Sequence, residues 1–176
     1  MNYIHLEKVD STNSYLKARY KTLPNWTILT TDLQSKGRGR LNHVWKSHKG
    51  KNLLCSILIK DKKILKKHKY LVELVGKVIH QLLIKLDISN WIKPPNDIYV
   101  KDKKICGILL ETISISDKLE ALVIGIGLNL NQKTFSKTLN ATSYYLIKKK
   151  EIDINKVKKI YIDILNKELN KLSLEK

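Results

Sequence analysis

Cysteine is scarce in this chain, with only Cys55 and Cys106 among 176 residues. Two cysteines cannot form the disulfide framework of a small secreted protein, and these two lack the CxxC spacing of a zinc site. No apolar run reaches the roughly 18 residues that cross a bilayer, and the N-terminus lacks the basic and then apolar regions of a secretory signal. These absences predict a reduced, cytoplasmic protein with no membrane partner.

Arginine is also scarce, although the formal net charge is +18. Only Arg19, Arg38 and Arg40 stand among 34 basic residues, and the lysines are spread in short blocks along the whole chain. Specific reading of DNA bases relies on bidentate arginine contacts. We therefore expect a solvated, lysine-rich surface and no DNA partner, with a positive field that attracts anionic ligands and acidic proteins.

No linker, repeat or low-complexity segment divides the sequence, so we expect one domain over 1–176. Hydrophobic patterns and turn residues predict the elements in order. They are a helix over 14–21, a strand over 26–31, a long loop over 34–50, a buried strand over 53–59, a helix over 70–86, a strand at 91–92, a hairpin of 98–100 with 105–110, a strand over 119–130 broken near its end by Gly125 and Gly127, and a helix over 154–172. This order predicts an α+β (α/β layered) fold, with a mixed sheet covered by helices.

The most informative segment is Gln34–Arg40, which ends in Gly37-Arg38-Gly39-Arg40. Glycine allows backbone N–H groups to approach a phosphate closely, and each arginine adds a charge-assisted fork. Trp45 follows five residues later and offers an apolar face to a flat ligand. We interpret the segment as an anion-binding loop rather than an ordinary basic surface loop.

Three other segments are weaker when each is considered alone. The segment 93–97 joins two prolines to Asn96 and Asp97, which suits a polar ligand or a metal-bound phosphate but also an ordinary turn. Lys104 begins an apolar strand and can enter a pocket, although a lone lysine is usually a surface charge. The segment 125–129, with two glycines and Asn129, fits either a ligand wall or a bend in a strand.

In this order, the segments resemble the biotin–protein ligases over nearly the whole chain. The family pattern has an STN segment, QxxGRGRxGRxW, KWPNDI, KxxGIL, GxGxN and an ATS stretch. The corresponding segments here are Ser11-Thr12-Asn13; Gln34 with Gly37–Arg40 and Trp45; Lys93 with Pro95–Ile98; Lys104 with Gly107–Leu109; Gly125–Asn129; and Ala141–Ser143.

The resemblance implies a class II aminoacyl-tRNA synthetase-like catalytic domain of the biotin/lipoate ligase type. It also implies the reaction: biotin and ATP, with Mg²⁺, give biotinyl-5′-adenylate, and the biotinyl group then passes to a lysine of a partner. The partner would be a biotin carboxyl carrier protein, a subunit of acetyl-CoA carboxylase. The sequence does not decide whether the protein forms a homodimer.

The resemblance assigns roles to matching residues. The catalytic set is Arg38, Arg40, Lys104 and Asp97, with Lys104 bridging the biotin carboxyl group and the phosphate. The biotin site would consist of Ser11, Thr12, Asn13, Gln34, Gly37, Arg38, Gly39, Lys104, Gly107 and Gly125. The ATP and adenylate site would consist of Arg38, Arg40, Trp45, Asn96, Asp97 and Asn129, with Asn129 at the adenine and Asp97 near a Mg²⁺ bound through ATP.

The chain departs from the family pattern in the loop, where Asn42 and His43 replace a second Gly-Arg, and at Pro94, which replaces a tryptophan. We expect weaker retention of the adenylate from the first change. We also expect no N-terminal helix-turn-helix domain before Ser11 and no C-terminal SH3-like barrel after the last helix.

Three alternatives remain. A lipoate ligase or octanoyltransferase shares the fold, and a transferase of that type uses a cysteine near a lysine. Cys106 lies two residues from Lys104, so both would share one face of a regular strand, although a thiol in an apolar run is usually a core residue. A basic nucleic-acid-binding module and an inactive relative of the ligases are the others.

Overall fold

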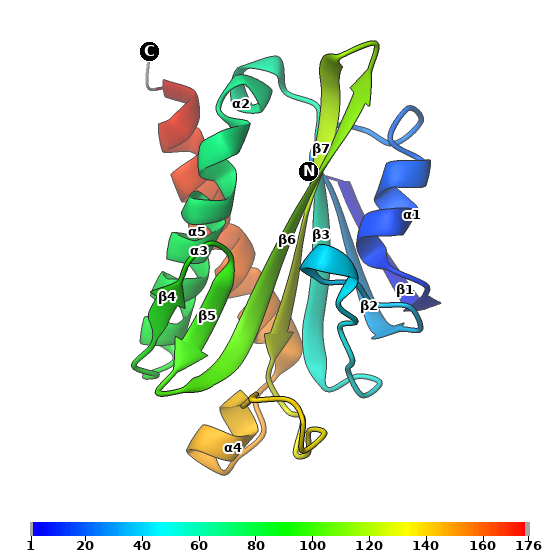
Figure 1. The fold of residues 1–176 in the computed structure, drawn as a ribbon. Helices are drawn as coiled ribbons and strands as arrows, with labels where there is room; N and C mark the ends of the chain where they lie inside the picture. The colour runs from blue at the N-terminus through cyan, green and yellow to red at the C-terminus, as the bar shows by residue number, and fades with distance from the viewer. Residues whose placement is uncertain (1, 175–176) are drawn as a thin grey trace.

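A computed structural model describes residues 2–174, which form one seven-stranded sheet with helices on both faces (Figure 1). The strand order is β1-β2-β3-β7-β6-β5-β4, in which β1 and β2 are parallel and all other neighbours are antiparallel. The strands are β1 (Asn2–Val9), β2 (Thr27–Gln34), β3 (Asn52–Ile59), β4 (Trp91–Lys93), β5 (Asp97–Val100), β6 (Lys103–Ile115) and β7 (Lys118–Asn129). The helices are α1 (Thr12–Ala18), the 3₁₀ turn η1 (Arg40–Asn42), α2 (Lys62–Lys66), α3 (His68–Lys85), α4 (Tyr144–Lys148) and α5 (Ile154–Leu174). The mixed sheet confirms the predicted fold class.

The two faces of the sheet have different coverings. The long helices α3 and α5 cover one face, where their apolar stripes meet β3, β6 and β7 in the larger core. Helix α1 covers part of the other face over a small cluster that includes Leu16, Leu58 and Val123. Because α1 has only seven residues, much of its face of the sheet is left for other groups.

Strand β3 and helix α3 confirm the clearest sequence predictions. Every residue of β3 is buried, as a continuous apolar run at the centre of a sheet requires. The buried apolar residues of α3 recur at helical spacing, and they are Leu71, Val75, Val78, Ile79, Leu82 and Leu83. No helix within residues 2–174 is both long and apolar enough to cross a membrane.

Strand β7 corrects the prediction that glycines would break it. It runs without interruption through Gly125 and Gly127 to Asn129. On its α1 face, the apolar Ala121 and Val123 are followed by the two glycines and then by Asn129. On that face, the first half of the strand therefore packs against α1 and the second half lines a cavity, while the opposite face stays apolar.

The predicted hairpin is present as β5 and β6, and a register shift occurs between Ile98 and Tyr99. Ile98 pairs with Cys106 but Tyr99 pairs with Lys104, so Ile105 is an extra residue in β6. Such a bulge reverses the alternation of side chains along the strand. Lys104 therefore faces the open side with Gly107, while Cys106 faces the larger core.

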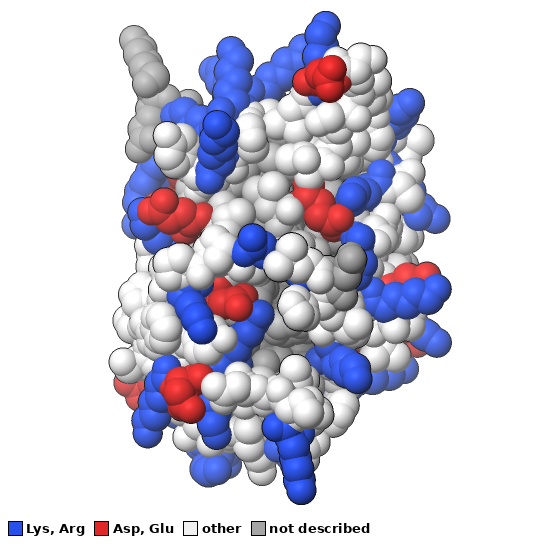
Figure 2. Space-filling model, viewed as in Figure 1, with Lys and Arg blue, Asp and Glu red and all other residues white. Residues whose placement is uncertain are grey.

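The sequence analysis did not predict strand β1, helix α2 or helix α4, and the other differences are small. Helix α1 begins two residues earlier than predicted because the hydroxyl of Ser11 accepts a hydrogen bond from the Ser14 amide and caps it. It also ends three residues early, at Ala18. The loop over 34–50 contains the turn η1, and the side chain of Asn42 lies outside the described part of the chain. Figure 2 shows lysines and arginines scattered over one face of the molecule with acidic residues among them, as expected of a solvated basic surface.

Candidate active site

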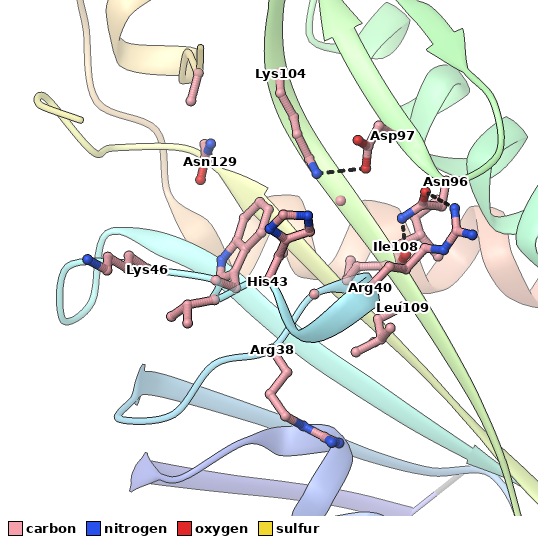
Figure 3. Close-up of a pocket in the computed structure, with 18 of the residues that line it drawn as sticks. Arg38, Arg40, His43, Lys46, Asn96, Asp97, Lys104, Ile108, Leu109 and Asn129 are labelled. Carbon is pink, nitrogen blue, oxygen red and sulfur yellow. Dashed lines mark hydrogen bonds and ion pairs between the residues drawn. The ribbon is translucent and has the colours of Figure 1, made fainter. Parts of the chain in front are cut away.

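The open part of the sheet forms a cavity of about 530 Å³ between β6, β7, the N-terminus of α1 and the loop after β2. All the site residues predicted from the sequence line it, except Gly37. These lining residues are Ser11, Thr12, Asn13, Gln34, Arg38, Gly39, Arg40, Trp45, Asn96, Asp97, Lys104, Gly107, Gly125 and Asn129. The fold thus brings segments that are far apart in sequence into one site (Figure 3).

One end of the cavity is a buried set of hydroxyl and amide groups. The backbone N–H and the hydroxyl of Thr12 both donate to Oε1 of Gln34, at 2.8 and 2.9 Å. The hydroxyl of Ser56 lies 2.6 Å from both Thr12 Oγ1 and Asn13 Oδ1. Fixed, neutral donors and acceptors of this kind bind an uncharged polar group, because they need no reorganisation when the group arrives.

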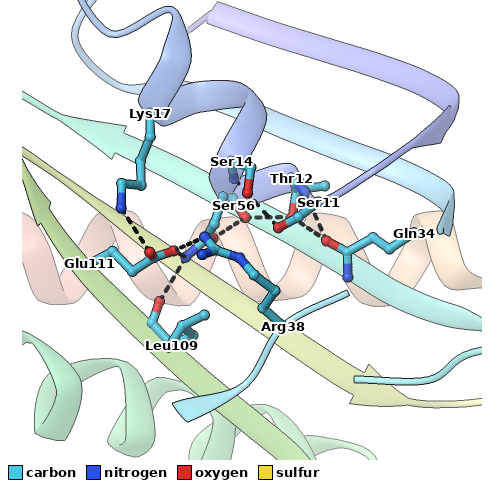
Figure 4. Close-up of polar contacts among 10 residues, drawn as sticks. Ser11, Thr12, Ser14, Lys17, Gln34, Arg38, Ser56, Leu109 and Glu111 are labelled. Atoms are coloured by element: carbon cyan, nitrogen blue, oxygen red, sulfur yellow. Dashed lines mark hydrogen bonds and ion pairs between the residues drawn. The ribbon is translucent and has the colours of Figure 1, made fainter. Parts of the chain in front are cut away.

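The amide of Asn13 connects this set to Glu111, a residue that the sequence analysis missed. Figure 4 shows Glu111 between Lys17 and Arg38. Asn13 Nδ2 donates to Glu111 at 2.9 Å, and Glu111 also accepts from Lys17 Nζ at 2.8 Å and from Arg38 Nη2 at 2.7 Å. Burial acts to raise the pKa of Glu111. The hydrogen bonds from Lys17 and Asn13 and the charges of Lys17 and Arg38 outweigh burial and lower this pKa below its usual value.

The other end of the cavity carries cations. Lys104 Nζ lies 2.7 Å from Asp97 Oδ1, and both side chains are less than one-third exposed. Arg40 Nη1 donates to Asn96 Oδ1 at 3.1 Å, and Asn96 Nδ2 donates to the Ile108 carbonyl at 2.8 Å. The β5–β6 hairpin therefore fixes the groups that could bind phosphate.

The guanidinium of Arg38 points away from Lys104 and toward Glu111 (Figures 3 and 4). The structure thus separates the two cations that the sequence analysis expects to act together. Arg38 lies on the loop after β2 and its side chain is 43% exposed, so it can rotate without disturbing the sheet.

Trp45 fills the open space beside the glycines of β6 and β7. Its ring lies against Gly107 and Gly127, and Lys104 Nζ lies 5.6 Å from the ring centroid. The ring nitrogen of Trp45 is buried with no hydrogen-bond partner among residues 2–174. An unpaired buried donor costs stability, so this nitrogen is available to an acceptor on a ligand.

Gly125 and Asn129 lie on either side of Gly127 in β7. A Cβ on residue 125 would overlap the Asn13 amide, so this glycine makes room for a protein side chain. Asn129 Nδ2 donates to the Thr142 carbonyl at 3.0 Å, while its Oδ1 is buried with no partner in the described chain. This oxygen is a free acceptor for an amino group.

Other site residues have weak sequence signals. Ser56 lies within an apolar run, where a single hydroxyl on the open face of β3 is the only clue. Phe135 and Leu139 line the cavity from an irregular segment after β7 that has no periodic pattern. Glu111 follows the KxxGIL segment closely but is one of 16 acidic residues.

Cys106 does not enter the cavity. Its side chain is buried in the core on the opposite face of the sheet, which confirms the expectation of a core thiol. The shared face with Lys104 that a regular strand would give, and that the transferase alternative requires, is not present. Burial raises the pKa of the thiol well above its usual value. A buried, protonated thiol is not a nucleophile.

Asp97 is the only carboxylate among the described residues that line the cavity. No group of three or more His, Cys, Asp or Glu side chains within residues 2–174 could hold a metal by itself. Mg²⁺ often binds through one or two carboxylates together with substrate phosphates. Asp97 therefore fits a Mg²⁺ that arrives with a nucleotide.

A cavity with a neutral polar end and a cationic end suits a ligand that carries both an uncharged polar group and an anion. The chain belongs to the Biotin/lipoate A/B protein ligase family, whose pattern matches residues 6–129. It is 35% identical over 112 residues to the bifunctional ligase/repressor BirA of Bacillus spizizenii, covering 63% of this chain and 34% of the relative. It is 33% identical over 139 residues to the chloroplastic biotin–protein ligase 1 of Arabidopsis thaliana, covering 76% of this chain and 38% of that protein. The chain thus spans only about a third of the length of these relatives.

Solved structures give the same assignment of fold. The biotin protein ligase of Aquifex aeolicus in complex with biotin and ATP superposes with a TM-score of 0.79 and 32% identity, over 98% of this chain and 72% of that one. The biotin protein ligase of Leishmania major in complex with biotinyl-5-AMP gives a TM-score of 0.77 at 22% identity, over 93% and 73% of the two chains. The second likeness concerns the fold alone.

Proposed function

We propose that this chain is the catalytic domain of a biotin–protein ligase, which activates biotin with ATP and transfers it to a lysine of a biotin carboxyl carrier protein. One observation carries the proposal: a single cavity joins a neutral polar end, built on Thr12 and Gln34, to a cationic end, built on Lys104 and Arg40. Membership of the ligase family supports the same reading.

In the first step, a carboxylate oxygen of biotin attacks the α-phosphorus of ATP, and the bond to the leaving pyrophosphate breaks. Two anions approach each other, so positive groups must lie where negative charge develops. Lys104 is suited to this role because its ammonium enters the cavity from the rigid strand β6. Arg40 is suited to the phosphates because Asn96 holds its guanidinium beside the same hairpin.

The neutral end suits the ureido ring of biotin, which carries both N–H donors and a carbonyl acceptor. The hydroxyl and amide groups around Thr12, Asn13 and Gln34 offer complementary acceptors and donors on buried elements. Trp45 would move from its place against Gly127 to cover the adenylate, and the free Oδ1 of Asn129 would accept from the adenine amino group.

In the second step, the ε-amine of the carrier lysine attacks the biotinyl carbonyl and AMP leaves. The adenylate is already an activated mixed anhydride, so no cysteine is needed and Cys106 has no role. Mg²⁺ would neutralise charge on the ATP phosphates, with Asp97 as its protein ligand.

The direct test is to incubate the protein with biotin, MgATP and a biotin carboxyl carrier domain, and to measure the intact mass of the carrier. We expect a gain of one biotinyl group that requires ATP. The matched control replaces biotin by lipoate or octanoate. Modification by lipoate alone, or no modification at all, would contradict the proposed substrate.

A further inference from the structure

The carboxylate of Glu111 lies behind the cavity and binds two cations from different elements. Lys17 on α1 contacts its Oε1 at 2.8 Å, and Arg38 on the loop after β2 contacts its Oε2 at 2.7 Å. The Glu111 side chain is only 16% exposed, and neither Glu111 nor Lys17 is among the described residues that line the cavity. Glu111 therefore does not touch a ligand directly.

The two cations are not equivalent. Lys17 belongs to a helix that packs on the sheet through Leu16, so it stays in place. Arg38 lines the cavity from a loop, and it is the more exposed of the two. A buried carboxylate that loses its only partner is strongly destabilising. Lys17 and Asn13 remain bound to Glu111 when Arg38 moves away. The loss of the Arg38 contact therefore does not leave an unpaired buried carboxylate.

We propose that Glu111 is a positioning residue that holds the Arg38 guanidinium away from Lys104 in the ligand-free protein and releases it to a nucleotide phosphate. The proposal rests on the proposed function only for the identity of that phosphate. Binding at Arg38 is then an exchange of one anion for another, in which a phosphate competes with Glu111.

The loop itself supplies a readout that needs no ligand. Its backbone has internal hydrogen bonds, from the Gly39 amide to the His43 carbonyl at 2.7 Å and from the Trp45 amide to the Gly37 carbonyl at 2.9 Å. These amides exchange with solvent only when the loop opens. Their exchange rates therefore report how firmly Glu111 holds the loop through Arg38.

The first experiment measures amide hydrogen exchange of residues 37–45 in the ligand-free wild type and in Glu111→Gln, Arg38→Met and the double variant. We expect faster exchange in each single variant and no further increase in the double variant, because both changes break the same contact. The matched control, Lys17→Met, also removes a cation from Glu111 but leaves Arg38 in place, so the loop should keep its slow exchange. Unchanged exchange in Glu111→Gln, or additive effects, would overturn the proposal.

The second experiment measures by calorimetry the affinity for Mg–α,β-methylene-ATP, which cannot transfer its α-phosphorus, with biotin present. The Arg38 side chain is 43% exposed and Glu111 keeps its other partners, so breaking this contact costs little. We therefore expect Glu111→Gln to bind the analogue about two- to fivefold more tightly than wild type. The gain should disappear in the Arg38→Met background. A lower melting temperature with unchanged affinity would reveal a merely structural role and overturn the release of Arg38 to phosphate, as would no binding of the analogue to either protein.

These outcomes are separable from the proposed function. Coupled exchange and tighter analogue binding without biotinylation of any carrier would support the role of Glu111 and contradict the ligase activity. Biotinylation of the carrier with no change in exchange would support the ligase activity and contradict the role of Glu111.

Discussion

The indole of Trp45 lies so close to Gly127 that a methyl group on residue 127 would overlap the ring around Nε1. Gly107 pairs with Gly127 across β6 and β7, and a Cβ there would lie 3.0 Å from the same ring. The two glycines therefore form a flat surface that Trp45 covers. A ligand entering this part of the cavity has to displace the ring.

We expect Gly127→Ala to push Trp45 and its loop away from the sheet. Overpacking of this kind costs about 1–3 kcal/mol, so the free energy of unfolding in urea should fall within that range. The fluorescence of Trp45, obtained by difference from a Trp45→Phe variant, should shift to longer wavelength as the ring becomes solvated.

A matched control for this glycine is Gly76→Ala in α3. A Cβ there would make ordinary contacts with Ile92 at 3.7 Å, so the change should stabilise the helix by about 0.5–1 kcal/mol and leave Trp45 fluorescence unchanged. Equal stability and equal fluorescence for Gly127→Ala and wild type would contradict the close packing of Trp45.

Lys104→Met should reduce adenylate formation without unfolding the protein. Loss of one preorganised group that stabilises transition-state charge costs about 10²–10³ in rate. Pyrophosphate release at saturating biotin and MgATP measures the effect. The neighbouring Lys103→Met removes the same charge from an exposed position of β6 and should keep wild-type activity; equal rates for both variants would exclude a role for Lys104.

Cys106→Ala should keep full acyl transfer, because the thiol lies in the core and away from the cavity. The lost packing should lower the free energy of unfolding by about 1–2 kcal/mol. Carrier modification followed by mass tests the first point and urea unfolding tests the second. A folded variant that no longer transfers the acyl group would restore the alternative of a cysteine-dependent transferase.

The contribution of Glu111 to stability should depend on pH. Its pKa is lowered in the folded protein from the usual 4.5, so the stabilisation is present above pH 4.5 and is lost as the pH falls through the folded-state pKa. The melting temperature of wild type should exceed that of Glu111→Gln at pH 7, and the gap should narrow in acid. Glu73→Gln, which removes an exposed partner of Lys77, should show only a small gap; a Glu111 gap that widens in acid would contradict the ion-pair network.

Biotin and MgATP together should raise the melting temperature more than the sum of their separate effects, because under the proposed function the adenylate made from them would contact both ends of the cavity. A ligand at 100 times its dissociation constant stabilises the folded state by about 2.7 kcal/mol. Scanning calorimetry with either ligand, with both, and with biotin plus the uncleavable ATP analogue separates adenylate formation from simple joint binding. Strictly additive shifts would argue against adenylate formation.

The helices and strands that the sequence predicts best are those whose buried residues follow a regular pattern over a short stretch of the chain. The apolar run of β3 and the apolar stripe of α3 fix both elements within a few residues. The bulge at Ile105 could not be predicted, since a regular strand places Lys104 and Cys106 on one face and only the pairing with β5 shows the extra residue. The same pairing decides that the lysine enters the cavity and the thiol does not.

The sequence by itself determined the layered α+β class and most of the predicted residues that gather in the cavity, because hydrophobic periodicity and ordered motifs are properties of the chain alone. The tertiary structure decided the partner of each charged group. Arg38 pairs with Glu111 and Lys104 with Asp97, although the members of the first pair are 73 positions apart. Such pairs depend on strand register and on which face each side chain occupies, and these are fixed only when the whole sheet assembles.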